Sequence, residues 1–132
     1  MKVKKKMCIK FQNIIKVKES NFKYNDGSGW KASTLIKEAK KRNLVPFRLY
    51  LNNINIGVAP FKIDDLYDFI VHVQRTKNTD LKYPVIMSET GVILDGWHRI
   101  AKGILSGKKY IMAVRFFINP KMDLQADKKT GE

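Results

Sequence analysis

The chain has 132 residues, which is long enough for one domain that buries its own hydrophobic core. Its single cysteine, Cys8, excludes an intramolecular disulfide framework and any metal site built on several cysteines. The basic N-terminus is not followed by an apolar segment of the signal-peptide type, and no stretch is apolar enough to span a membrane. We therefore expect a cytoplasmic protein with no membrane partner.

The charge of the chain is strongly basic and unevenly distributed. Lysine and arginine number 26 against 12 acidic residues, a formal net charge of +14, and residues 1–48 alone hold 14 basic and 3 acidic side chains. Such a surface attracts nucleic acid, an acidic protein or another anionic surface. A solvated lysine-rich face is the alternative, because lysine outnumbers arginine 21 to 5 and arginine reads phosphates and bases more specifically. DNA or RNA is therefore a candidate partner.

The N-terminal third predicts a peripheral strand, a loop and a helix. Apolar side chains alternate with lysine in part of residues 7–18, as in a strand. Residues 25–29 have the composition of a loop, and a helix follows over 30–42, with Ser28 or Ser33 as its cap. The cations of this helix are the candidate nucleic-acid-binding residues: Lys37, Lys40, Lys41 and Arg42.

The middle of the chain predicts a strand over 47–51, a connector over 52–60 and a helix over 64–76. Asp64 or Asp65 can cap this helix. Its apolar residues recur at i, i+3, i+4 and i+7, which predicts a face buried in the core: Leu66, Phe69, Ile70 and Val73.

The C-terminal third predicts a hairpin over 84–94, with Gly91 supplying the positive φ of its turn. A helix over 97–106 follows, which Gly107 ends, and then a last strand over 110–118.

Together these elements predict a single α+β domain over residues 1–122, with a small mixed sheet and about three helices. Residues 123–132 are polar, and we expect them to form a flexible C-terminal tail. The sequence contains no internal repeat and no low-complexity linker.

Polar function is most concentrated in Asp95-Gly96-Trp97-His98-Arg99, which follows an apolar run and opens a predicted helix. A glycine lets the backbone approach a ligand closely, and a helix N-terminus offers free N–H groups. His98 and Arg99 add two cationic side chains. The segment therefore predicts an anion-binding site, although a simple turn between strand and helix is the alternative.

Residues around this segment extend the pattern: Tyr83-Pro84-Val85-Ile86, the run 91–99, Ala101, Gly107 and residues 111–115. They resemble the ParB/sulfiredoxin superfamily, which has a strand–turn–strand, a Gly-x-His-Arg or Gly-Glu-Arg-Arg element at a helix start, and a closing strand. The chain looks closest to the small free-standing ParB-like proteins of bacteria and phages that carry Asp-Gly-x-His-Arg.

The resemblance implies a pocket for ATP or a related nucleotide, with Mg²⁺. Gly96 and the first helical N–H groups would cradle a phosphate, and His98 and Arg99 would pair with its oxygens. Trp97 would stack on the base or pack in the core. Asp95 would cap the helix, orient His98 or hold the metal ion.

Trp97 also marks a departure from the superfamily. It stands where sulfiredoxins carry their catalytic cysteine and where ParB proteins carry the glutamate tied to CTP hydrolysis. Sulfinic acid reduction is therefore not expected. A complete chromosome-partitioning protein is not expected either, because no helix-turn-helix domain follows.

The remaining functions belong to three classes. The first is a nucleotide-binding domain with ATP-dependent phosphotransfer or hydrolysis near nucleic acid, for which Asp95 and His98 are the candidate catalytic residues. The second is a ParB-like nuclease module that binds DNA or RNA, and the third is a non-catalytic interaction protein on the same fold.

His72 and Arg75 could line the same cleft, although a solvated helix face is the favoured interpretation. A kinase also needs a carboxylate base, for which five residues are available: Asp64, Asp65, Asp68, Asp80 and Glu89.

Overall fold

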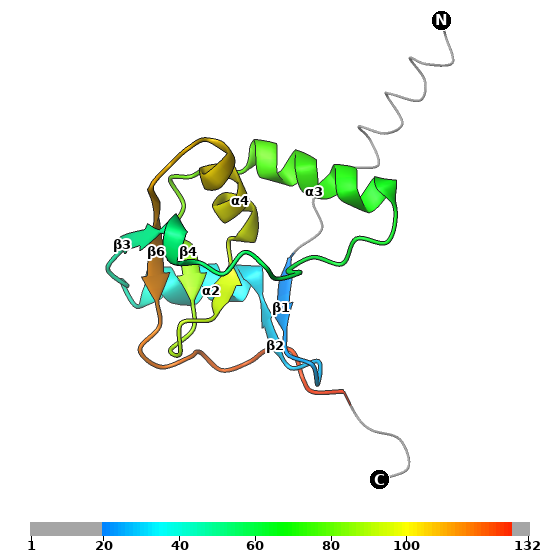
Figure 1. Ribbon diagram of the computed structural model, residues 1–132. Coiled ribbons are helices and arrows are strands. Elements are labelled where there is room, and N and C mark those ends of the chain that lie inside the picture. The colour runs from blue at the N-terminus through cyan, green and yellow to red at the C-terminus, as the bar shows by residue number, and fades with distance from the viewer. Residues whose placement is uncertain (1–19, 128–132) are drawn as a thin grey trace, which may run out of the picture.

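The computed structural model describes residues 20–127 of the chain (Figure 1). In chain order the elements are β1 (Asn21–Lys23), β2 (Gly29–Lys31), α2 (Ala32–Lys41), β3 (Phe47–Tyr50), η1 (Leu51–Asn53), α3 (Leu66–Asn78), β4 (Val85–Met87), β5 (Ile93–Asp95), α4 (Trp97–Leu105) and β6 (Tyr110–Arg115). Within this range the predicted α+β class, the mixed sheet and the three helices are confirmed. The strand expected within residues 7–18 lies outside the described residues. None of the helices in the described range is long and apolar enough to cross a membrane.

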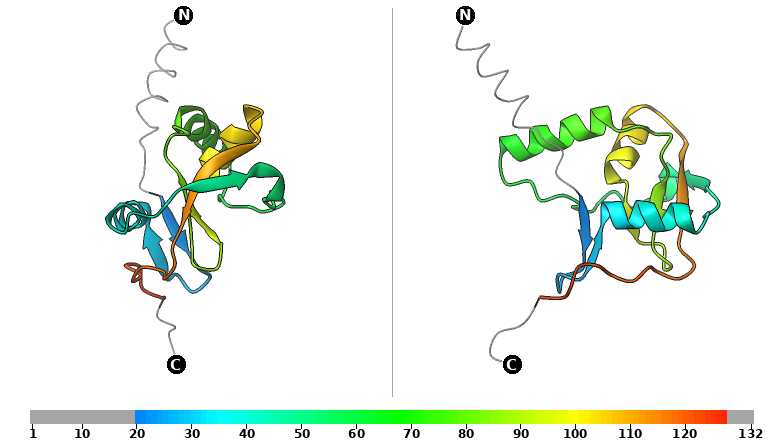
Figure 2. Two further views of the ribbon diagram at one scale, coloured as in Figure 1. Left: turned by 90° about the vertical axis from the view of Figure 1, so that its left-hand side faces the viewer. Right: turned by 180° about the vertical axis from the view of Figure 1, so that it is seen from behind.

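The four-stranded sheet has the order β3-β6-β4-β5, with β6 antiparallel to β3 and parallel to β4. β4 and β5 form the predicted hairpin, whose turn contains Gly91 with a φ of 85°. Successive side chains of β4 point to opposite faces. Val85 packs with Ile100 of α4, whereas Ile86 packs with Leu35 of α2. The helices α2 and α4 therefore cover opposite faces of the sheet (Figure 2).

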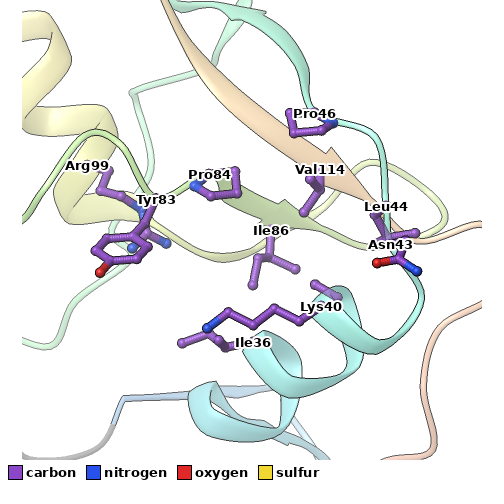
Figure 3. Close-up of a pocket in the computed structure, with 11 residues that line it drawn as sticks. Ile36, Lys40, Asn43, Leu44, Pro46, Tyr83, Pro84, Ile86, Arg99 and Val114 are labelled. Carbon is purple, nitrogen blue, oxygen red and sulfur yellow. The ribbon is translucent and has the colours of Figure 1, made fainter.

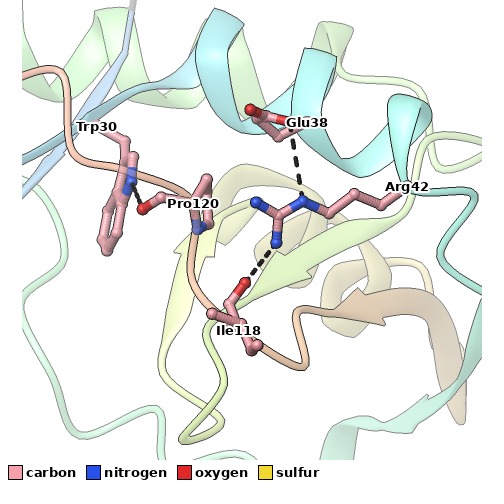
Figure 4. Close-up of polar contacts among 5 residues, drawn as sticks. All are labelled: Trp30, Glu38, Arg42, Ile118 and Pro120. Carbon is pink, nitrogen blue, oxygen red and sulfur yellow. Dashed lines mark hydrogen bonds and ion pairs between the residues drawn. The ribbon is translucent and has the colours of Figure 1, made fainter.

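The hairpin β1–β2 differs from the sequence prediction, which places only a loop before the helix. Its Trp30 is fully buried, and the indole N–H donates a hydrogen bond to the carbonyl of Pro120 at 2.9 Å (Figure 4). Gly29 forms an antiparallel bridge with Leu124. The described part of the expected flexible tail, residues 123–127, is therefore held against the domain by backbone pairing with this hairpin.

The start of α2 is stabilised from a distant part of the chain. Its N-cap is Lys31, not Ser28 or Ser33, and no side chain of its own caps it. One carboxylate oxygen of Asp123 accepts a hydrogen bond from the Lys31 N–H at 3.1 Å, and the other accepts one from the Thr34 hydroxyl. In a capping box, an acidic side chain of the first helical turn accepts a hydrogen bond from the N-cap N–H. Here Asp123 supplies that acceptor from a distant part of the chain.

The helix α3 lies at the edge of the molecule and packs mainly on α4 (Figure 1). Its N-cap is Asp65, whose carboxylate accepts a hydrogen bond from the Asp68 N–H at 2.8 Å. The prediction that its apolar face lies in the core is wrong. Leu66, Phe69 and Val73 are 70%, 52% and 41% exposed, because α3 turns its other face toward α4.

Candidate anion-binding site at the start of α4

Gly96 connects β5 to α4 in a conformation that residues with side chains rarely adopt. Its φ is 123°, and a Cβ atom at this position would lie 2.9 Å from Val85 Cγ2. The Gly96 carbonyl accepts a hydrogen bond from the Ile100 N–H at 3.0 Å, and no side chain caps the helix. The N–H groups of the first turn have no partner within the helix, so the start of α4 favours an anion.

Asp95 and Arg99 form a largely buried ion pair across the start of α4. Arg99 Nη2 donates to Asp95 Oδ2 at 2.7 Å, and the two side chains are 14% and 16% exposed. The partner of the Asp95 carboxylate is therefore Arg99. The sequence prediction gave it a helix N–H, His98 or a metal ion instead. Arg99 Nε is buried without a hydrogen-bond partner among the described residues.

His98 is hydrogen-bonded to a second histidine, His72 of α3. The contact joins His98 Nε2 and His72 Nδ1 at 2.9 Å. The ring planes differ by 12° and the ring centroids are 5.2 Å apart, so the rings lie end to end around a nearly linear N–H···N bond. Phe61 stacks on both rings, with centroid distances of 4.4 and 4.2 Å.

The histidine pair is uncharged at neutral pH. Burial, followed by the nearby His72, Arg75 and Arg99, lowers the pKa of His98 to about 4, and burial also lowers the pKa of His72. The expectation of a cationic His98 therefore does not hold. At pH 7 the free nitrogen of this ring, Nδ1, is either an N–H donor to an anion or a proton acceptor, depending on which histidine donates in the shared hydrogen bond.

Two polar cavities of about 560 Å³ each adjoin the start of α4. Both are lined by Arg75, Asp95, Gly96 and His98, and His72 lines one of them. The favoured interpretation of His72 and Arg75 as a solvated face is therefore wrong. The sequence signal for the cleft was their spacing of three residues, which places both on the side of α3 that faces α4.

A third cavity of about 670 Å³ lies between α2 and the sheet, and Arg99 lines both this cavity and one of the polar cavities. Its walls are mainly apolar and include Ile36, Tyr83 and Pro84 (Figure 3). A ligand with a flat apolar ring and an anionic group fits such a combination. Trp97 is partly buried against the core on the α4 face of the sheet, as expected for the packing role.

The predicted nucleic-acid-binding cations differ in whether their side chains contact the rest of the protein. The three lysines of α2 are exposed, and Lys40 also lines the apolar cavity. Arg42 is engaged instead: its Nε lies 3.8 Å from Glu38 Oε2, and its Nη1 donates to the Ile118 carbonyl (Figure 4). Its guanidinium also lies 5.3 Å from the ring centre of Phe116. Arg42 therefore stabilises the fold in this conformation.

A metal ion held by Asp95 does not fit the residues present. The Asp95 carboxylate is bound to Arg99, and no three His, Cys, Asp or Glu side chains group into a metal site within residues 20–127. Asp95 is also the only carboxylate among the described residues that line the two polar cavities. None of the five carboxylates considered as a kinase base lines them.

Comparisons with known proteins add no relative. No protein-family model matches the chain, and no curated protein or solved structure matches it. The resemblance to ParB and sulfiredoxin proteins therefore stays a prediction.

Proposed function

We propose that this chain is a nucleotide-binding domain of the ParB/sulfiredoxin type, which holds the phosphates of ATP or a related nucleotide at the start of α4. The observation that carries this proposal is the uncapped helix start at Gly96, which borders cavities lined by Arg75 and Arg99. The order hairpin, helix, closing strand agrees with the arrangement expected of that superfamily.

The proposed contacts follow from the donors at this place. Phosphate oxygens accept hydrogen bonds from the N–H groups of the first turn and from Arg99, whose bonds to an anion are charge-assisted. In the tautomer in which Nε2 accepts from His72, His98 contributes its Nδ1–H as a neutral donor. The base occupies the apolar cavity beside Arg99, where Tyr83 and Ile36 offer apolar surface.

The histidine pair is the proposed acid–base group of any phosphotransfer or hydrolysis at this site. Asp95 is bound to Arg99, so it is poorly placed to take a proton from a nucleophile. In the tautomer in which His98 Nε2 donates to His72 Nδ1, His98 Nδ1 is free to accept that proton, and the shared hydrogen bond stabilises the imidazolium that results. The lowered pKa of His98 makes it a weak base in the ligand-free protein.

Ligand-induced thermal shifts test the proposal, with ATP, ADP, CTP and pyrophosphate, each with and without Mg²⁺. A ligand at 100 times its Kd stabilises the folded state by about 2.7 kcal/mol, which raises the Tm of a domain of this size by roughly 10 °C. Arg99→Lys keeps the charge but loses the forked geometry, and we expect it to weaken binding.

A matched pair of variants checks the location of the base. Lys40 lines the apolar cavity and Lys37 does not, although both are exposed lysines of α2. Lys40→Ala should weaken nucleotide binding more than Lys37→Ala does. The absence of any shift with all four ligands, or equal binding by wild type and Arg99→Lys, contradicts the proposal.

A second candidate function is binding of DNA or RNA by the exposed lysines of α2. The exposure of Lys37, Lys40 and Lys41 and the basic first 48 residues favour it. A nuclease active site receives less support. Clustered carboxylates that hold catalytic metal ions are not present among the described residues.

A further inference from the structure

The outer face of α3, formed by Leu66, Phe69 and Val73, is an apolar surface that faces solvent. The three residues follow the spacing i, i+3, i+7, and Ile63 just before the helix is also 46% exposed. A helix of 13 residues is stabilised mainly by packing. The contact of α3 with α4 includes the hydrogen bond between His72 and His98. The outer face has the composition of a contact surface.

The charges at the two ends of α3 are opposite. Asp64, Asp65 and Asp68 lie at its start, and they outnumber the one nearby cation, Lys62, whose Nζ lies 3.7 Å from Asp64 Oδ2. Lys77 lies in its last turn and is exposed, whereas Arg75 of the same turn faces the cavities beside α4. An antiparallel copy of the same helix places the acidic start against the basic end twice and also opposes the helix dipoles. In a chain of net charge +14, this pairing of opposite charges offsets part of the repulsion between two copies.

We propose that two copies of the chain associate through the outer faces of α3, with the two helices antiparallel about a two-fold axis. Phe69 of one copy then packs near Val73 of its partner, and Asp64 lies near Lys77. None of Leu66, Phe69 and Val73 lines the cavities around α4, so these cavities remain accessible in the dimer.

Light scattering after size exclusion and sedimentation velocity test this proposal on the full chain. We expect twice the mass of one chain for the wild type. Phe69→Glu should raise the dissociation constant of the dimer by roughly tenfold or more, because it places a charge in the centre of the contact. Phe117→Glu is the matched control, since Phe117 is 90% exposed and borders a cavity to which no residue of α3 contributes.

Charge reversal separates a specific contact from general stickiness. Asp64→Lys alone and Lys77→Glu alone place like charges opposite each other and should weaken the dimer, whereas the double variant should restore it. Circular dichroism of each variant checks that the domain remains folded. A single-chain mass at every concentration, as expected if a different protein covers this face, overturns the proposal. So does equal dissociation by Phe69→Glu and Phe117→Glu, or a double variant no better than the single ones.

Discussion

Gly96 is the residue on which the geometry at the start of α4 depends. Gly96→Ala places a side chain at φ 123° and a Cβ atom 2.9 Å from Val85 Cγ2. We expect it to lower the free energy of unfolding by about 2–4 kcal/mol, from backbone strain and overpacking, as measured by urea denaturation. Gly107→Ala is the control, because Gly107 has a φ of 71° but open space around its Cβ position. Equal losses in the two variants would show that the contact with Val85 is unimportant.

The histidine pair predicts how stability depends on pH. The pKa of His98 is lowered from its ordinary value of 6.5 to about 4, and that of His72 is lowered too, so the unfolded chain binds protons that the folded chain does not. The contribution of the pair to the free energy of unfolding should therefore decrease as the pH falls from about 6.5 to about 4 and level off below that, where the lowered pKa of Asp26 and of Asp123 causes a separate loss. The chain has only these two histidines, so no other side chain has an ordinary pKa near 6.5.

The variant His98→Gln checks this assignment. It removes the group with the larger shift, and we expect a smaller difference in unfolding free energy between pH 7 and pH 4.5 than in the wild type. Urea denaturation at several pH values measures that difference. An unchanged pH dependence in His98→Gln would assign the titration to other groups.

The sequence predicts the place of the candidate site better than its internal contacts. A glycine before His98 and Arg99 at a strand-to-helix junction is a local pattern, and it located the start of α4 correctly. The partner of His98 is 26 residues away on α3, and its lowered pKa results from burial. Neither can be deduced before the packing of α3 on α4 is known.

At the scale of elements, the start of α2 depends on a carboxylate from the end of the described chain. Asp123→Ala removes the acceptors of the Lys31 N–H and the Thr34 hydroxyl, so it should cost about 1 kcal/mol, as loss of a helix cap does. Thermal or urea denaturation measures the loss. Gln125→Ala, two residues further along and exposed, is the control. Equal stability of the two variants would contradict the capping role.

Most helices and strands agree with the sequence prediction to within a few residues, because they rest on local periodicity and turn residues. The helix predicted over 97–106 spans Trp97–Leu105, and the helix predicted over 64–76 spans Leu66–Asn78. The periodicity of α3 identified the helix but not its surroundings, since an apolar face can meet a partner as well as a core. The hairpin β1–β2 was not predicted because each of its strands has only three residues, and the hydrogen-bond partner of its buried Trp30 is 90 residues away in the sequence.

At the scale of the whole molecule, the distribution of charge predicts salt-dependent binding of nucleic acid. Fluorescence anisotropy should show log K falling linearly with log salt for both DNA and RNA. Lys37→Ala and Lys41→Ala should each make the slope less steep by about one. Arg42→Ala should leave the slope unchanged, because Arg42 contacts Glu38 and the Ile118 carbonyl. Binding that is absent at low salt contradicts this function.

The long-range contacts of Trp30 and α2 also bear on how the chain folds as it is synthesised. The hydrogen-bond acceptor of the Trp30 indole is the Pro120 carbonyl, 90 residues later in the chain. The acceptor of the Thr34 hydroxyl is the Asp123 carboxylate, 89 residues later. While the chain is still growing on the ribosome, the largest buried side chain has no partner for its N–H. We therefore expect the domain to fold after residue 123 has emerged, in one cooperative step rather than from its N-terminus onward.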